Sequence, residues 1–261
     1  MLKDIQQQKQ FKVLLIGDIC QDVYVFGDVN RISPEAPVPV LKKSRKERRQ
    51  GMSGNVHENL LQMSKNTQVE FHCNNINDIK KIRFIDEKSN YQIMRYDIEN
   101  TIDSFDVISV HDKKYDAIII SDYNKGFLKE NTIEKIFDKF QGSQIFVDSK
   151  RRNIGSFKNC IMKLNEKESK EAFNKNENTE IITTLGQKGC SFRGKHFNTN
   201  KVVVHDVCGA GDVFLASLVV RWLETRDLES AIKTANRCAA LSVTKLGCYT
   251  VSREEYENLC I

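Results

Sequence analysis

The sequence predicts an α/β protein in which a mainly parallel central sheet is flanked by helices and carries a small β lid. Short β-rich runs alternate along the chain with amphipathic helical stretches, which is typical of a parallel sheet covered on both faces. The 261 residues, of which 40% are hydrophobic, are enough to bury one substantial core. We therefore expect one domain over residues 1–261, with lid segments at about residues 20–45 and 80–100.

The elements of the central sheet follow from this alternation. The candidate central strands are residues 11–16, 116–121, 144–148, 160–164 and 180–185. The candidate helices are residues 55–64, 129–140, 166–173, 210–224 and 228–246. Gly247 is placed to end the last helix, because glycine readily adopts the left-handed conformation at a helix C-terminus.

Two segments depart from the alternation and predict strands that are exposed on one face. All three prolines of the chain lie in residues 33–40, where they force an extended backbone and remove hydrogen-bond donors. This segment is therefore expected at an edge or in a flap. Residues 81–98 contain two alternating runs around a turn at residues 87–90, which is typical of a β-hairpin. Together the two segments are expected to form the lid sheet.

Composition limits the partners and the compartment. Lys and Arg number 40 against 35 for Asp and Glu, and only one basic cluster occurs, at residues 42–49. So small an excess of positive charge favours small anionic ligands over nucleic acid. The eight cysteines are scattered without C-x-x-C or metal-ligand spacing, so they are expected as reduced thiols. The polar N-terminus and the lack of a long apolar run predict a cytoplasmic protein with no membrane segment.

The most informative motif is G-A-G-D, where a strand is expected to end and a helix to begin. Glycines allow a phosphate to approach closely, and the free N–H groups of Gly209, Ala210 and Gly211 would point at it. Asp212 at the helix start is placed to accept a proton from an attacking hydroxyl while these N–H groups stabilise a transferring phosphoryl group. The alternative is an ordinary glycine turn into a helix. No Walker-type or dinucleotide glycine motif occurs in the sequence.

With its neighbouring motifs, this stretch resembles the PfkB, or ribokinase-like, carbohydrate kinases. Residues 206–212 match the C-terminal signature of that family, and G-M-S-G-N at residues 51–55 looks like its glycine-rich signature that grips the sugar. N-E-K-E at residues 165–168 matches its N-x-x-E motif, and T-L-G-Q-K-G at residues 184–189 matches the stretch beside the nucleotide. The resemblance covers nearly the whole chain and implies a ribokinase-like fold with ATP and Mg²⁺ as cosubstrate and cofactor.

Within this family the chain resembles most the kinases of heptose 7-phosphate. R-I-S-P-E-A-P-V-P-V at residues 31–40 is the most specific part of that resemblance. G-D-I-C-Q-D at residues 17–22, S-D-Y-N-K-G at 121–126, V-D-S-K at 147–150 and K-L-G at 245–247 add to it. It implies phosphorylation of the anomeric hydroxyl of heptose 7-phosphate to a 1,7-bisphosphate in ADP-heptose and lipopolysaccharide precursor synthesis.

The resemblance also implies which residues bind the sugar phosphate. Asp22, Gly51 and Asn55 would contact the sugar. Arg95 and Lys125 are cationic candidates for the phosphate of the substrate. The simpler alternatives are a turn cap for Asp22, a helix N-cap for Asn55 and solvated surface positions for the two cations.

The remaining roles lie on the ATP side. Asn165 and Glu168 would hold Mg²⁺ through water, although Glu168 is also a plain candidate for a first-turn helix acid. The residues implied at the ATP site are Thr184, Gly186, Gly189 and Asn236.

The chain departs from the family pattern at three places. Met52 stands where a second glycine is usual, which is expected to crowd or reshape the sugar pocket. Val207 and Cys208 replace a common threonine pair, which puts a nearby monovalent-cation site in doubt. The stretch between residues 64 and 81 has room only for a loop and a short strand.

Three functions therefore stay open. The first is the heptose 7-phosphate kinase, the second a kinase for another sugar or sugar phosphate, and the third a catalytically degenerate protein that binds a sugar phosphate or nucleotide. A homodimer through the lid strands is also expected, because exposed strand edges need a cover.

Overall fold

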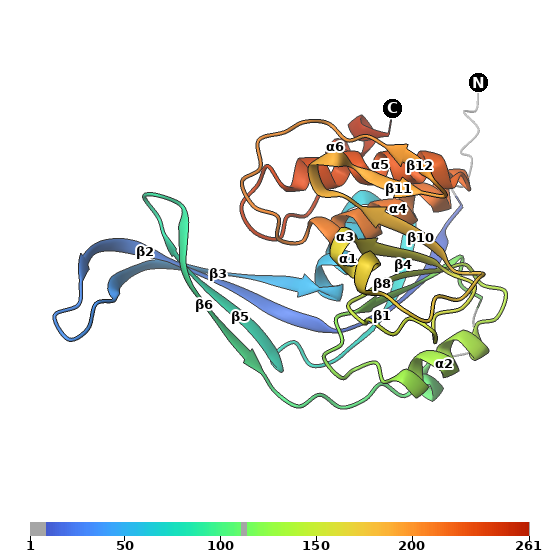
Figure 1. Ribbon diagram of the computed structural model, residues 1–261, viewed down its shortest axis with the longest axis horizontal. Coiled ribbons are helices and arrows are strands. Elements are labelled where there is room, and N and C mark those ends of the chain that lie inside the picture. The colour runs from blue at the N-terminus through green and yellow to red at the C-terminus, as the bar shows by residue number, and fades with distance from the viewer. Residues whose placement is uncertain (1–8, 111–113, 261) are drawn as a thin grey trace, which may run out of the picture.

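In a computed structural model, which describes residues 9–110 and 114–260, the chain forms two sheets (Figure 1). The strands of the larger sheet are β1 (Phe11–Gly17), β4 (Thr67–Cys73), β7 (Ala117–Asp122), β8 (Ile145–Ser149), β9 (Ile161–Asn165), β10 (Glu180–Thr184), β11 (Cys190–Phe192) and β12 (Lys195–Phe197). Their order is β12-β11-β10-β9-β8-β7-β1-β4. The pairs from β4 to β10 are parallel, and β11 and β12 add antiparallel pairs at the far edge.

Helices cover both faces of the larger sheet. They are α1 (Ser53–Met63), α2 (Glu130–Lys139), α3 (Glu166–Glu171), α4 (Ala210–Thr225), α5 (Leu228–Ser242) and α6 (Arg253–Leu259). Because successive residues of a strand point to opposite faces, Val13 and Leu15 pack with residues of α1, α4, α5 and α6, whereas Leu14 and Ile16 pack in the cluster that contains α2. The apolar runs of the sequence are thus strands that are buried on both sides.

The central strands and the helices lie where the sequence predicted them, with one correction. The last long helix, α5, ends at Ser242 rather than at residue 246. Tight turns follow it, in which Thr244 and Lys245 donate to carbonyls three residues earlier. Gly247 (φ 75°) therefore lies in the loop beyond, where a Cβ would lie 2.8 Å from Tyr24 Oη. Position 247 therefore requires glycine because the chain approaches the smaller sheet closely there, and not because a helix ends there.

The smaller sheet is a long twisted ribbon that projects from the body of the protein (Figure 1). Its strands are β2 (Ile19–Ile32), β3 (Pro39–Met52), β5 (Ile79–Asp86) and β6 (Tyr91–Glu99), in the order β3-β2-β5-β6. The hairpin between β5 and β6 turns at residues 87–90, as predicted. The proline segment forms the connection from β2 to β3 and the start of β3, which is an edge strand.

A short connection joins the two sheets. Residues 74–78 alone lead from β4 to β5, in agreement with the brief stretch expected between residues 64 and 81. Asn74 anchors this connection, because its side chain accepts from the backbone N–H of Ile19 at 2.8 Å and donates to the carbonyl of Ile19 at 3.2 Å. The root of the smaller sheet is thereby fixed beside the carboxyl ends of β1 and β4.

Two further findings concern the expected compartment. Among the described residues, no helix has the length and apolar character needed to cross a membrane. Residues 1–8, which form most of the polar N-terminus used in the expectation of a cytoplasmic protein, lie outside the described residues.

Candidate active site

The candidate base, Asp212, lies in the first turn of α4 and is buried, with 2% of its surface exposed. Two side chains from distant segments hold it. Tyr123, directly after β7, donates its hydroxyl to Oδ1 at 2.6 Å, and Asn55 in α1 donates its amide to Oδ2 at 3.2 Å. Both carboxylate oxygens are therefore fixed in direction, as a base that must meet one particular hydroxyl requires.

Burial raises the pKa of the Asp212 carboxyl to about 6 from an ordinary value of 3.8. The negative charge of Asp148 acts in the same direction. The hydrogen bonds from Tyr123 and Asn55 lower the pKa, as does the positive charge of Lys163. A carboxyl group with this pKa is mostly ionised at pH 7 and is still basic enough to accept a proton during a reaction.

The glycine loop that opens α4 has the conformation of an anion site. Gly209 caps the helix in the left-handed conformation, with φ at 75°. A Cβ on Gly209 would lie 2.5 Å from Asn55 Nδ2. A Cβ on Gly211 would lie 2.7 Å from Lys163 Nζ. Glycine at both positions thus lets polar side chains approach the N–H groups at the helix start, where Ala210 is the first helical residue.

A cleft of about 920 Å³ opens over this loop and over the carboxyl ends of β8, β9 and β10. Its lining contains four lysines, Lys150, Lys163, Lys167 and Lys170, and three acidic residues, Asp148, Glu166 and Glu171, which leaves an excess of one positive charge in what we call the basic cleft. Lys163 is buried within β9 and forms an ion pair with Asp148 of β8. A cleft with this charge at a helix N-terminus favours a polyanion such as a chain of phosphates.

A second cavity, of about 550 Å³, lies beside the first. All four residues expected at the ATP site line it, namely Thr184, Gly186, Gly189 and Asn236. Thr184 and Gly186 also line the basic cleft, so the two cavities meet at the end of β10. The rest of the lining includes the apolar residues Phe214, Ala239, Ala240 and Val243. An apolar cavity that continues into a basic cleft has the polarity of a nucleotide, with a flat base at one end and phosphates at the other.

Asn165 and Glu168 form a capping box at the start of α3. Asn165 Oδ1 accepts from the N–H of Glu168 at 2.8 Å, and Glu168 Oε2 accepts from the N–H of Asn165 at 2.8 Å. Lys150 Nζ forms ion pairs with Glu168 Oε1 at 2.7 Å and with Asp148 Oδ1 at 3.2 Å. The motif therefore has a structural role, and its oxygens fit a Mg²⁺ ion through water better than by direct ligation, because direct ligation would displace these partners.

Asp22 of β2, one of the residues expected to contact the sugar, is buried and forms an ion pair with Arg83 of β5. Gly51 of β3, which pairs with Cys20, lies close by, and a Cβ there would overlap Asp22 Oδ2, so this position requires glycine. Asn55 joins the two halves of the site, because its amide also donates to the carbonyl of Gly209 at 3.3 Å. The structure therefore brings Asp22, Gly51 and Asn55 together near the glycine loop.

Arg95 and Lys125 lie farther out, at the smaller sheet. Arg95 is exposed on β6 and forms an ion pair with Asp97 at 2.9 Å. In register it pairs with Arg83, so both project from the same face of the sheet. Lys125 forms an ion pair with Glu99 at the end of β6. Neither cation lines the two cavities described above.

The sequence reasoning missed several residues of the site. Tyr123 and Lys150 lay inside stretches already noted as characteristic, S-D-Y-N-K-G and V-D-S-K, and those stretches were the available signal. Lys163 is a lysine within the apolar run I-M-K-L-N, where a charge in a buried strand indicates a partner. Arg83 had no such signal, because a basic residue in a half-exposed strand is common.

The structure also describes the departures from the family pattern. The Met52 side chain is buried in the hydrophobic cluster that contains Leu14 and Ile16, so the expectation that it crowds the sugar pocket is wrong, whereas the expectation that it reshapes that pocket stays a prediction. Its backbone has φ at 58°, which explains why glycine suits this position.

Cys208 lies 3.3 Å from Cys248, measured between the sulfur atoms. All eight cysteines are free, as expected.

Comparison with known proteins gives the site a context. Residues 157–255 match the model of the pfkB family carbohydrate kinases. The chain is 30% identical over 312 residues to the bifunctional protein HldE of Haemophilus influenzae (strain PittEE), a match that includes 96% of this chain and 63% of that protein. It is 29% identical to the bifunctional protein HldE of Campylobacter curvus, with 96% of this chain and 65% of that protein covered. The chain thus spans less than two thirds of the length of these relatives.

Solved structures show the same fold. The ribokinase of Thermotoga maritima superposes with a TM-score of 0.70 at 18% identity, covering 95% of this chain and 99% of that one. Phosphofructokinase-2 of Escherichia coli, solved in complex with potassium, gives a TM-score of 0.70 at 12% identity over 97% of this chain and 98% of that one. The architecture described above is therefore the ribokinase-like fold.

Proposed function

Since this chain belongs to the PfkB family of carbohydrate kinases, we propose that it transfers the γ-phosphoryl group of ATP to the anomeric hydroxyl of heptose 7-phosphate. The observation that carries the proposal is Asp212, buried at the head of the glycine loop with its carboxylate held by Tyr123 and Asn55. The choice of sugar is supported by the HldE relatives and by the R-I-S-P-E-A-P-V-P-V stretch at residues 31–40.

The proposed reaction is an in-line displacement. Asp212 accepts the proton of the attacking sugar hydroxyl. Because Tyr123 and Asn55 orient the Asp212 carboxylate, the sugar oxygen is held with a lone pair directed at the γ-phosphorus. The N–H groups at Gly209 and Gly211 then stabilise the charge on the transferring group. The Ala210 N–H is not free as expected, because it donates to the carbonyl of Val207 at 3.3 Å, and it would join them only by leaving that partner. The new bond joins the sugar oxygen to phosphorus, the bond from phosphorus to the β-phosphate oxygen breaks, and ADP leaves.

In this proposal the nucleotide spans both cavities. Its base occupies the apolar cavity at Thr184, Gly186, Gly189 and Asn236, and its phosphates extend into the basic cleft. The lysines of that cleft offset the charge of the phosphates. Asn165 and Glu168 would hold Mg²⁺ through water, and the ion would supply charge neutralisation between the phosphates of the nucleotide.

The sugar phosphate is proposed to lie between the glycine loop and the smaller sheet. Asp22, Gly51 and Asn55 would contact the ring, and Arg83 would keep Asp22 in position. Arg95 and Lys125 would meet the substrate phosphate when the smaller sheet moves over the sugar as a lid. Such closure excludes water and so limits hydrolysis of ATP.

The test is an ADP-release assay with ATP, Mg²⁺ and a panel of sugar phosphates that includes D-glycero-D-manno-heptose 7-phosphate, with and without K⁺. Asp212→Asn is expected to lower kcat by about 10²- to 10⁴-fold, because a base in proton transfer contributes on that order. Asp138→Asn on the exposed face of α2 is the control and should leave turnover unchanged.

Other outcomes would redirect the proposal. Turnover with a different sugar phosphate alone would assign another kinase specificity, for which the short connection between β4 and β5 gives structural grounds. Binding of ATP and sugar phosphate without turnover would assign a binding protein on a kinase scaffold.

A further inference from the structure

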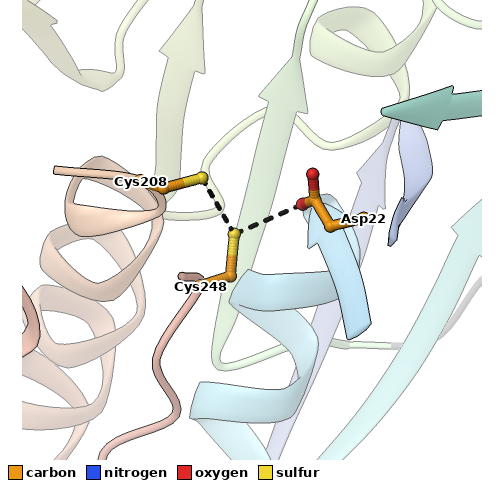
Figure 2. A group of neighbouring side chains, drawn as sticks. All are labelled: Asp22, Cys208 and Cys248. Atoms are coloured by element: carbon orange, nitrogen blue, oxygen red, sulfur yellow. Dashed lines mark hydrogen bonds between the residues drawn. The ribbon is translucent and has the colours of Figure 1, made fainter. Parts of the chain in front are cut away.

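Three potential metal ligands converge behind the sugar side of the site (Figure 2). They are Asp22 on β2, Cys208 in the loop before α4 and Cys248 in the loop after α5. The two sulfur atoms are 3.3 Å apart, and Cys248 Sγ is 3.3 Å from Asp22 Oδ2. All three donor atoms lie within 4.8 Å of one another. The fold thus collects two thiols and a carboxylate from segments that are far apart in the sequence.

Two of the three spacings between these atoms are close to those of a tetrahedral site, and the third, between Cys208 Sγ and the Asp22 carboxylate, is within 4.8 Å. Bonds of about 2.3 Å to sulfur and about 2.1 Å to oxygen place neighbouring ligand atoms of Zn²⁺ roughly 3.6–3.8 Å apart. The observed separations of 3.3 Å need to widen by a few tenths of an ångström. Cys208 and Cys248 both lie in loops, where such a shift is easily accommodated.

The charges around the cluster also suit a divalent cation. Asp22 uses Oδ1 for the ion pair with Arg83, so Oδ2 is the oxygen that faces the thiols. Two thiolates and one carboxylate carry three negative charges, which a divalent cation and the Arg83 guanidinium balance. A buried cluster with no net charge avoids the penalty of an uncompensated ion.

The backbones of the two cysteines are held by neighbouring groups. Asp206 Oδ1 accepts from the N–H of Cys208 at 2.9 Å. Tyr24 Oη accepts from the N–H of Cys248 at 3.1 Å. These contacts fix the backbone at each cysteine, and Arg83, which is bonded to Asp22 and donates to Cys208 Sγ at 3.4 Å, is the outer partner that reaches the ligands themselves.

We propose that Asp22, Cys208 and Cys248 form a binding site for a thiophilic divalent cation such as Zn²⁺. Three protein ligands leave a fourth position for water, as in open zinc sites. The bound cation takes the Oδ2 oxygen of Asp22, and so it inhibits binding of the sugar phosphate. Inhibition rests on the proposed function, whereas binding of the cation does not.

Co²⁺ is the probe for binding, because cobalt bound to thiolates has a ligand-to-metal charge-transfer band and the visible bands of a tetrahedral ion. The full chain is titrated anaerobically in a non-thiol reductant. We expect one Co²⁺ per chain, displaced by Zn²⁺, and loss of the charge-transfer band in the double variant Cys208→Ser/Cys248→Ser. Asp22→Asn should weaken binding at least tenfold, and Cys73→Ser at the end of β4 should bind as the parent chain does.

The proposal is overturned if the reduced chain shows no thiolate band, or if the band persists in the double cysteine variant. Circular dichroism of each variant checks that it is folded, and Asp22→Asn tests the site without altering either sulfur. A disulfide between Cys208 and Cys248 is the rival account of any sensitivity to Zn²⁺ preparations in air. Mass spectrometry of the alkylated protein distinguishes the two accounts, since loss of activity only in chains whose two thiols are oxidised would refute inhibition by the bound metal.

Inhibition is measured separately. If the chain phosphorylates a sugar phosphate, Zn²⁺ should raise the KM for that substrate at least tenfold while leaving the KM for ATP unchanged. A rise in the KM for ATP alone would place the inhibitory ion elsewhere. A chain without kinase activity would still give the cobalt result, so failure of the proposed function and failure of the metal site are distinguishable.

Discussion

At the scale of single residues, the site depends on a carboxylate that is buried but not isolated. Asp212 has a pKa of about 6 because burial disfavours its charge, and Tyr123 and Asn55 limit that rise. Because the folded-state pKa lies above the ordinary 3.8, this group lowers the stability of the folded state as the pH rises from 3.8 to about 6, and the loss is complete above that pH. The buried carboxylate thus costs some stability at neutral pH, a cost that functional carboxyl groups often carry.

The pH dependence of turnover follows from the same residue. The base acts when it is deprotonated, so kcat/KM is expected to rise with pH through about 6 and then to level off. In Tyr123→Phe the hydrogen bond that lowers the pKa is lost, so the rise should move to higher pH. Tyr115→Phe, whose hydroxyl donates to Glu70 far from the loop, is the control. A profile that does not shift in Tyr123→Phe would show that Tyr123 does not tune the base.

At the scale of elements, the N-x-x-E motif illustrates how one stretch can have a structural and a chemical reading. It is a capping box at the start of α3, and α6 begins with a second capping box formed by Ser252 and Glu255. The two motifs have the same hydrogen-bond pattern. Only the first lies at the basic cleft, which Asn165 lines.

This pair of capping boxes gives a matched experiment. Asn165→Ala and Ser252→Ala are each expected to lower the free energy of unfolding by about 1 kcal/mol, because each removes an N-cap. Only Asn165→Ala is expected to lower kcat, and increasing Mg²⁺ should partly restore it. Urea denaturation and steady-state kinetics measure the two effects. Equal kinetic effects of both variants would reduce the motif at residues 165–168 to its capping role.

In the smaller sheet, Arg95 on β6 is the proposed contact to the phosphate of the substrate. Arg95→Ala is expected to raise the KM for a sugar phosphate about tenfold, and to have less effect on the KM of the same sugar without its phosphate, because a charge-assisted contact to phosphate contributes about 1.5 kcal/mol or more. Arg193→Ala is the control, since Arg193 is an exposed arginine that pairs with Glu180 and lies between β11 and β12, at the edge of the larger sheet. If both substrates lose affinity equally, Arg95 supports the lid rather than the phosphate.

At the scale of the whole molecule, the smaller sheet has little core of its own. Its own hydrophobic cluster contains Tyr24, Phe26 and Ile85, with Leu246 packed against it. Exposed apolar residues lie on it instead, at Ile32, Val38, Tyr91, Met94 and Tyr96. A long ribbon with exposed edges and apolar side chains is stabilised when another surface covers it.

We therefore expect a homodimer in which the smaller sheets of two chains cover each other. Met94→Asp on β6 should shift sedimentation equilibrium toward the monomer by at least tenfold in the dissociation constant, because the charge would be buried at the interface. Ile108→Asp, at an exposed residue outside the smaller sheet, should leave the equilibrium unchanged. A parent chain that sediments as a monomer at all concentrations would contradict this arrangement.

The sequence by itself determined the architecture and pointed to four residues that line one cavity beside Asp212. Apolar runs specify strands buried on two faces, and local patterns such as G-A-G-D and T-L-G-Q-K-G are contiguous, so their chemistry is legible without a fold. The proline segment and the hairpin at residues 81–98 likewise carry their signal in local backbone preferences. The four residues expected at the ATP site do line one cavity.

Only the tertiary structure decided which distant side chains complete the site. Tyr123 reaches Asp212 across 89 positions of sequence, and Cys248 reaches Asp22 across 226. Such contacts depend on strand order and on where each loop returns to the sheet, and no local pattern encodes either. The end of α5 and the burial of Met52 were decided in the same way, because the packing of Gly247 against Tyr24 and of Met52 in the core outweighs local preference.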